Sequence, residues 1–379
     1  MTDFLIDPER DLQLSAYSYD LPTERIAQNP VTPRDRSKLL VIDGLETHQH
    51  CHFYDLAAWL RSGDLLVLNN TKVIPARLFG QKSTGGAAEL LLIEPIDEIR
   101  WLALVRPGRR IQPGTELLFG EGVGDGEQPL LKAFVEDRDE PTGGRIVRLA
   151  PQVETSVAEL IHRLGQVPLP PYITQSSSLP EQYQTVFAQR EGAIAAPTAG
   201  LHFTQDLFTQ LANKGIDTAE VTLHVGIGTF RPVEVTDIET HEMHQERIEV
   251  PAETVEKIRQ TKANGGRVIT VGTTSTRALE GVAAICGKLE PYTGKTNLFI
   301  YPGYQWQVID GMITNFHLPE SSLLMMVSAL IGRERLMAVY EDAIAQNYRF
   351  YSFGDAMLIL PEALSVQSHR SEDLWEKPF

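Results

Sequence analysis

The sequence predicts an α/β domain, a sheet with flanking helices, into which a small all-β barrel is inserted. Two observations support this prediction: short β-rich runs separated by turn residues in the first half, and helices alternating with apolar strands around them. We therefore assign residues 1–60 and 156–379 to the α/β domain and residues 61–155 to the barrel. The 379 residues are enough for two domains of ordinary size.

Six short apolar runs predict the strands of the inserted domain, and Gly- and Pro-rich turns separate them. In chain order these runs are 65–68, 89–93, 101–105, 116–119, 132–135 and 145–149. No helical pattern interrupts them, which favours a small barrel or sandwich.

The flanking segments show the period of helices. Apolar residues at helical spacing predict helices over 156–165, 204–215, 252–265, 321–331 and 334–346. Between them, 216–225 alternates like a strand and 267–271 is an apolar strand. This alternation is typical of an α/β sheet.

The composition is that of an acidic globular protein. Thirty-four Lys and Arg against fifty Asp and Glu give a net charge of −16, which repels nucleic acid and anionic membranes. Two cysteines are too few for a disulfide framework or a Cys-based zinc site. The N-terminus lacks the features of a signal peptide, and no apolar run approaches the ~18 residues of a membrane span. We expect a cytoplasmic protein without membrane contact.

Basic residues nevertheless cluster locally, in segments 25–38, 71–82 and 101–114. Each cluster alone fits a solvated face, but two of them fall within the predicted barrel. A small β-domain with basic loops is a suitable platform for a phosphate backbone. The expected nucleic-acid contacts are Lys72, Arg77, Arg106, Arg109 and Arg110.

Four loops of the α/β part combine glycine, threonine or histidine, at 195–203, 223–230, 271–279 and 310–322. For the first, taken alone, we favour a structural histidine in a helix N-terminal loop over a ligand loop that offers backbone N–H groups and an imidazole. The G-x-G of the second lacks the third glycine of a dinucleotide fingerprint. The third follows a buried strand, where ligands bind in open α/β sheets, although Ser and Thr also cap helices. The mixed composition of the fourth favours function.

Two histidines, His241 and His244, have a spacing that could place a metal on a helix. The known zinc-protease arrangement requires a spacing of four and a third ligand, so we favour a polar turn here. We predict no metal.

Six segments, taken as an ordered set, resemble the S-adenosylmethionine:tRNA ribosyltransferase-isomerase family, which builds epoxyqueuosine on tRNA. They are 19–40, 63–80, 196–204, 223–233, 271–280 and 310–330, spread over nearly the whole chain. One departure is Asn70, which stands where the family is expected to have an aspartate.

The resemblance implies transfer of the ribosyl part of S-adenosylmethionine to 7-aminomethyl-7-deazaguanine at the tRNA wobble position. The ribosyl group isomerises, and adenine and methionine leave. S-adenosylmethionine is then a consumed co-substrate, no true cofactor is implied, and the enzyme is expected to be a monomer. A methyltransferase would require the missing glycine fingerprint, and a non-catalytic RNA-binding module would leave the four loops unexplained.

The reaction needs a base for a ribose C5′ proton, and a neutral imidazole suits that near neutral pH. His317 is the first candidate, His202 the second, and His224 lies on a third implied loop. The expected substrate contacts are Thr198, Gly200, Gly226, Gly228 and Thr229 in the loops; Thr273, Thr274, Ser275 and Arg277 for the methionine carboxylate; Asn315 and Glu320 for adenine; and Phe203, Phe230 and Phe316 for the sulfonium.

Overall fold

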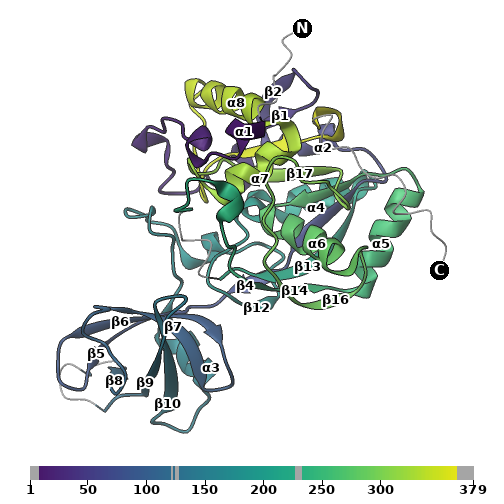
Figure 1. Cartoon of the computed structure of the whole chain (residues 1–379). Helices are drawn as coiled ribbons and strands as arrows, with labels where there is room; N and C mark the ends of the chain where they lie inside the picture. Colours follow the sequence, from purple (N-terminus) through teal and green to yellow (C-terminus); the bar gives the residue numbers. More distant parts are fainter. Residues whose placement is uncertain (1–7, 121–122, 124–127, 227–232, 365–379) are drawn as a thin grey trace.

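The computed structural model describes residues 8–120, 123, 128–226 and 233–364 of the chain (Figure 1). It contains a nine-stranded mixed sheet with helices, a seven-stranded antiparallel sheet and a two-stranded sheet. Six strands of the second sheet close into a barrel, because β8 also pairs with β5. The predicted fold class is therefore confirmed.

The large sheet has the strand order β16-β14-β13-β3-β15-β17-β18-β1-β2. Neighbouring strands β13, β3, β15 and β17 are parallel, so their carboxyl ends lie at one edge of the sheet. The bounds in chain order are β1 (Lys38–Ile42), β2 (His48–His52), β3 (Leu65–Asn69), β13 (Asp217–His224), β14 (Glu246–Val250), β15 (Val268–Val271), β16 (Tyr292–Thr296), β17 (Gly311–Asn315) and β18 (Ala356–Ile359).

Helices cover both faces of this sheet, and β3 shows why. Leu65 and Val67 join an apolar cluster with α5 (Ala252–Ala263), α6 (Thr273–Cys286), α7 (Ser322–Ile331) and α8 (Arg333–Ala345). Leu66 and Leu68 point the other way, into a cluster with α2 (Leu56–Trp59) and α4 (Gln205–Asn213). Successive side chains of a strand face opposite sides, so an uninterrupted apolar run suits a sheet buried on both faces.

The barrel lies at one end of the molecule in Figure 1, apart from the large sheet. Its strands are β5 (Arg77–Lys82), β6 (Ala87–Pro95), β7 (Arg100–Arg106), β8 (Glu116–Phe119), β9 (Leu131–Asp139) and β10 (Gly144–Pro151), with the short β11 (Gly165–Gln166) added beside β5. Its interior is a separate apolar cluster. The five runs expected between 89 and 149 are confirmed as strands of this barrel.

Two elements lie elsewhere than the sequence predicted. The run 65–68, expected in the barrel, is β3 in the middle of the large sheet. Helix α3 (Val157–Leu164), expected in the α/β part, packs its buried Val157, Leu160 and Ile161 into the barrel cluster. In both cases the apolar side chains fit either core, and tertiary packing decides between them.

A buried ion pair joins the starts of two neighbouring strands of the large sheet. Arg267, before β15, donates from Nε to Asp64 Oδ1 at 3.0 Å and from Nη2 to Oδ2 at 2.6 Å. The Asp64 side chain is fully buried and that of Arg267 is 8% exposed. Asp64 directly precedes β3, so this bidentate contact fixes β3 against β15 at their amino ends.

We predict that Asp64→Ala lowers the free energy of unfolding by about 3–5 kcal/mol, because it leaves a buried guanidinium without its bidentate counter-charge. Urea unfolding of the purified chain measures this. Glu136→Ala, which breaks the exposed pair with Arg148 on the barrel, is the control and should cost less than about 1 kcal/mol. Equal losses in the two variants would contradict the assignment of Asp64 as a buried structural charge.

Candidate functional site

Three of the four candidate loops meet at the carboxyl edge of the parallel strands. In the 3-10 helix Thr198–His202, Thr198 Oγ1 lies 3.2 Å from Asn315 Oδ1 at the end of β17. A Cβ on Gly272, where α6 begins, would lie 3.5 Å from the Cβ of Ala199. Ligands bind at this edge in open α/β sheets. Gly200 is buried within the same turn.

The remaining loop, 223–230, continues from the end of β13. Gly226 is half-buried there. Gly228, Thr229 and Phe230 lie outside the described residues. In the sheet, β3 and β15 separate the end of β13 from that of β17, a distance of roughly 14 Å at the usual strand spacing.

His202 is fully buried, and both of its ring nitrogens are occupied. Nε2 lies 3.2 Å from Arg34 Nη2 and 3.1 Å from Asn315 Nδ2, and Nδ1 lies 2.6 Å from Ser37 Oγ. Guanidinium and amide NH₂ groups only donate, so Nε2 accepts and Nδ1 carries the ring proton. Burial, followed by the charges of Arg34 and Arg349, lowers the pKa of His202 well below its usual range. This neutral imidazole therefore links its own turn to Arg34, Ser37 and Asn315, and it has no free lone pair.

His317 is differently placed, with one ring nitrogen still available. Its Nε2 lies 2.8 Å from Thr314 Oγ1, and its backbone N–H donates to the Tyr340 hydroxyl at 2.9 Å. No described residue hydrogen-bonds to Nδ1. Burial lowers the pKa of His317 to about 3, so its imidazole is neutral near pH 7 and Nδ1 or Nε2 offers a lone pair.

His224, the last residue of β13, faces a cleft instead. The cleft has a volume of 780 Å³, within the range of ligand sites, and lies between strands β13, β14 and β16 of the large sheet and β6 and β7 of the barrel. Thr71 Oγ1 lies 2.8 Å from His224 Nδ1. Burial, followed by the charge of Arg247, lowers the pKa of His224.

Gly192 makes room for this ring. A Cβ there would lie 2.9 Å from His224 Cε1, closer than side chains tolerate, and its φ of +148° also favours glycine. On the other side of the cleft, Lys295 Nζ on β16 reaches Glu94 Oε1 on β6 at 3.1 Å. The cleft is thus bordered by charges of both signs.

Asn70, where the resemblance led us to expect an aspartate, satisfies its neighbours as an amide. Its Nδ2 donates to Glu220 Oε2 at 2.8 Å and its Oδ1 accepts from Thr222 Oγ1 at 2.7 Å. A carboxylate at this position would face the Glu220 carboxylate directly. The amide removes that like-charge contact.

Some polar side chains at the start of α6 are bonded within the protein, and others have no partner among the described residues. Ser275 Oγ donates to the Val271 carbonyl at 2.9 Å. Arg277 is buried and pairs with Glu246, which balances its charge, whereas its Nη2 has no hydrogen-bond partner among the described residues. The buried Thr274 hydroxyl also has no hydrogen-bond partner among the described residues, and Thr273 is largely buried. Buried polar groups are normally satisfied, so Thr274 and Arg277 Nη2 are the groups most available to a ligand.

Two of the aromatic side chains expected beside the sulfonium, Phe203 and Phe316, are buried. Phe203 and Phe316 are 1% and 0% exposed. Phe203 packs on Phe53 and Phe208, with ring centroids 5.0 Å apart in each case, and Phe316 packs on Phe350 at the same distance. Both rings are therefore packed in the apolar core.

Sequence reasoning missed Tyr351. Its φ of +71° is strained for a non-glycine residue, as is the φ of +57° at the half-buried Glu320, and such strain concentrates at functional sites. Tyr351 stacks on Tyr172 at 4.4 Å, and its carbonyl accepts from Asn315 Nδ2 at 3.2 Å. The aromatic density of residues 349–353 was the only signal in the sequence.

The five basic residues lie on several elements, and three of them contact an acidic side chain. Arg77 and Arg106 both approach Glu89 on the barrel, at 3.6 and 3.9 Å. Arg109 and Arg110 are exposed in the turn after β7 and form no ion pair within the described residues. Lys72 lies on β4 (Thr71–Val73), which pairs with β12 (Arg190–Ala193) in the two-stranded sheet, and it binds Glu191 at 2.9 Å.

The lowered pKa of His317 makes a prediction about acid stability. An unfolded imidazole has a pKa of about 6.5, so below that pH the unfolded chain binds a proton that the folded His317 does not bind. The folded chain therefore loses stability as the pH falls from about 6.5 toward 3. When the pH falls from about 7.5 to about 5, the free energy of unfolding of His317→Gln should therefore decrease by about 2 kcal/mol less than that of the native chain.

Urea unfolding at the two pH values measures this difference. His52→Gln, which removes an exposed imidazole, is the matched control. An unchanged pH dependence in His317→Gln would show that the folded imidazole is protonated as easily as the unfolded one.

Comparison with known proteins places these features in a family. A family model described as "Queuosine biosynthesis protein" matches residues 14–359. The S-adenosylmethionine:tRNA ribosyltransferase-isomerase of Acaryochloris marina is 60% identical, over 97% of this chain and 98% of that one. The protein of the same name from Synechococcus elongatus is 60% identical, over 93% and 97%.

A solved structure agrees. The S-adenosylmethionine tRNA ribosyltransferase of Thermotoga maritima is 40% identical and superposes with a TM-score of 0.52, covering 91% of this chain and 100% of that one. Within the described residues, no helix combines the length and apolar character needed to cross a membrane. The chain therefore belongs to the S-adenosylmethionine:tRNA ribosyltransferase-isomerase family of queuosine biosynthesis proteins.

Proposed function

We propose that this chain transfers the ribosyl group of S-adenosylmethionine to 7-aminomethyl-7-deazaguanine at the tRNA wobble position and isomerises it to epoxyqueuosine. The observation that carries this proposal is 60% identity, over nearly the full length, to relatives named for that activity. Adenine and methionine leave, so S-adenosylmethionine is consumed as a co-substrate and no resident cofactor takes part. The enzyme works as a cytoplasmic monomer.

The ribosyl chemistry takes place at the carboxyl edge of the parallel strands, among loops 198–202, 272–276 and 315–317. Three polar groups support this location, because none has a hydrogen-bond partner among the described residues: Thr274 Oγ1, Arg277 Nη2 and His317 Nδ1. The first two provide donors for the methionine carboxylate. Asn315 Nδ2 is bonded to His202 and Tyr351, so its Oδ1, which already accepts from Thr198, is the atom left to accept from the adenine amino group.

The three histidines take different roles in this proposal. His317 removes the C5′ proton, since it is neutral and keeps a free ring nitrogen. Its low pKa, about 3, keeps the imidazole unprotonated near neutral pH, so it can accept the C5′ proton that the adjacent sulfonium acidifies. His202 is a positioning residue because both of its nitrogens are bonded.

His224 contacts the incoming tRNA base in this proposal, because the end of β13 is too far from the end of β17 for it to act beside His317 on the same ribosyl carbon. It faces the cleft between the large sheet and the barrel, and no described residue hydrogen-bonds to its Nε2. The barrel also carries the exposed Arg109 and Arg110. A wobble base lies in a single-stranded loop, so it can enter such a cleft without the cost of leaving a duplex.

The reaction is tested by incubating the protein with S-adenosylmethionine and tRNA that bears the 7-aminomethyl-7-deazaguanine base. The free adenine that is released is then measured. Adenine should form in step with epoxyqueuosine, and His317→Ala should lower kcat by about 10²–10⁴-fold, as for loss of a general base. His52→Ala is the control. Formation of S-adenosylhomocysteine would instead establish methyl transfer, and an unchanged rate in His317→Ala would exclude this histidine as the base.

The basic turn predicts a separate effect on tRNA. Replacing Arg109 and Arg110 together by alanine should raise KM for tRNA, leave KM for S-adenosylmethionine unchanged, and reduce the salt dependence of tRNA binding by about one unit of slope per lost contact. Arg148→Ala, on another barrel strand and paired with Glu136, is the matched control. Equal effects of the two changes would mean that the turn makes no specific backbone contact.

A further inference from the structure

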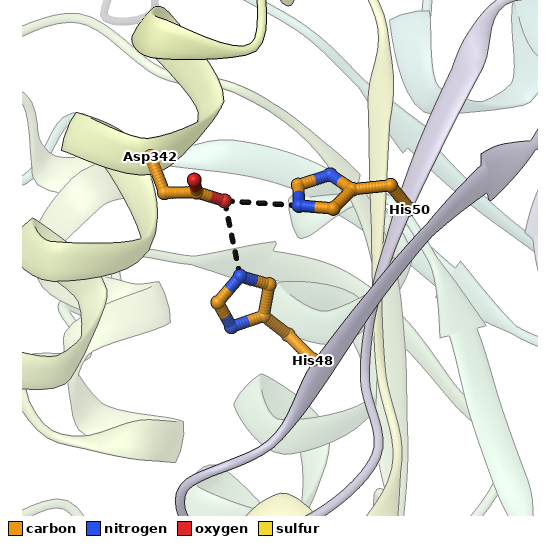
Figure 2. Close-up of side chains that lie close together, drawn as sticks. All are labelled: His48, His50 and Asp342. Carbon is orange, nitrogen blue, oxygen red and sulfur yellow. Dashed lines mark hydrogen bonds and ion pairs between the residues drawn. The ribbon is translucent and has the colours of Figure 1, made fainter.

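Three potential metal ligands meet at the edge of the large sheet farthest from β14 and β16. Figure 2 shows His48 and His50, from β2, and Asp342, from α8, pointing toward one another. The Nε2 atoms of both histidines lie 3.0 Å from the same oxygen, Oδ2 of Asp342. All three ligand atoms lie within 4.8 Å of one another, and no other group of three His, Cys, Asp or Glu residues within the described ranges is arranged in this way.

The sheet itself brings the two histidines together. They are two positions apart on β2, so their side chains leave the same face of this edge strand. Their ring centroids are 5.4 Å apart, and the rings are nearly perpendicular. Asp342 completes the group from a helix 294 residues after His48. Because Asp342 is so distant in the sequence, no local motif joins the three residues, and the sequence led us to predict no metal.

A second hydrogen bond orients His50 as a ligand. Its Nδ1 lies 2.9 Å from the Tyr348 hydroxyl, which in turn lies 3.3 Å from the Leu39 carbonyl. When Tyr348 donates to that carbonyl, Nδ1 carries the ring proton and Nε2 presents its lone pair to the Asp342 carboxylate. Such an outer hydrogen bond is the usual companion of a histidine metal ligand. A lone pair and a carboxylate oxygen 3.0 Å apart repel each other, so either a ring proton or a metal ion has to lie between them.

We propose that His48, His50 and Asp342 bind a divalent transition-metal ion of the zinc class, with a fourth position open to water. Two imidazoles and one carboxylate suit Zn²⁺ and Co²⁺. Ligands of a tetrahedral zinc ion are about 3.3 Å apart, so the 3.0 Å contacts need to open by only about 0.3 Å. The side chains are 28%, 38% and 32% exposed, which gives the ion access from solvent.

The ion would have a structural role. It would tie β2, an edge strand, to α8, and binding to the folded chain alone stabilises that state. In the sheet, β1 and β18 separate β2 from β17 and its candidate loop. The site is therefore independent of the proposed reaction.

The test uses the full chain without an affinity tag, stripped with EDTA and titrated with Co²⁺ alone. The native chain should bind one equivalent and develop the visible d–d absorption bands of a four-coordinate ion, and Zn²⁺ should displace them. His48→Ala and the isosteric Asp342→Asn should each weaken Co²⁺ binding at least tenfold. His52→Ala is the matched control, because this exposed histidine shares the face of β2 but stacks on Tyr54, and it should bind as the native chain does.

Thermal unfolding provides a second readout that does not depend on the spectrum. Zn²⁺ should raise the unfolding temperature of the native chain and of His52→Ala but not of Asp342→Asn. The proposal is overturned if the native chain takes up no stoichiometric Co²⁺, or if His48→Ala and Asp342→Asn bind it as tightly as the native chain.

Discussion

The candidate site depends on one neutral imidazole, that of His202. It donates to Ser37 and accepts from Arg34 and Asn315, so it joins the N-terminal segment, the turn at 198–202 and the end of β17. A proton on Nε2 would face two N–H donors, so the network exists only while the ring is uncharged. Burial that lowers the pKa of His202 therefore maintains the geometry on which the neighbouring loops depend.

A second buried group places the loop that leads into β17. The Glu280 carboxylate, on α6, accepts from the backbone N–H groups of Gln307, Val308 and Ile309 at 2.9–3.0 Å and from the Tyr304 hydroxyl at 3.1 Å. Burial raises its pKa, and these donors partly offset that effect. The same helix that begins at Thr273 thus holds the chain entering β17, so the start of α6 and the Asn315 loop are fixed relative to each other.

The parallel strands and the barrel contribute different features to the proposed function. Parallel pairing of β13, β3, β15 and β17 gathers loops that are distant in the sequence at one edge, where Thr274 Oγ1 and Arg277 Nη2 have no hydrogen-bond partner within the described part of the chain. The barrel adds an exposed basic turn and one wall of the cleft at His224. In the proposed function, these features give an acidic protein a local surface for tRNA while its remaining charge opposes nonspecific binding.

The sequence by itself determined the fold class, five barrel strands, the helices and the family, because alternation, turn residues and motif order are local properties of the chain. Only the tertiary structure decided that the run at 65–68 joins the large sheet, that α3 completes the barrel core, and that Phe203 and Phe316 are core residues. It also decided which histidines keep a free nitrogen, and that Asp342 meets His48 and His50. Short apolar runs and single polar side chains fit several environments equally well, and contacts between distant residues select one.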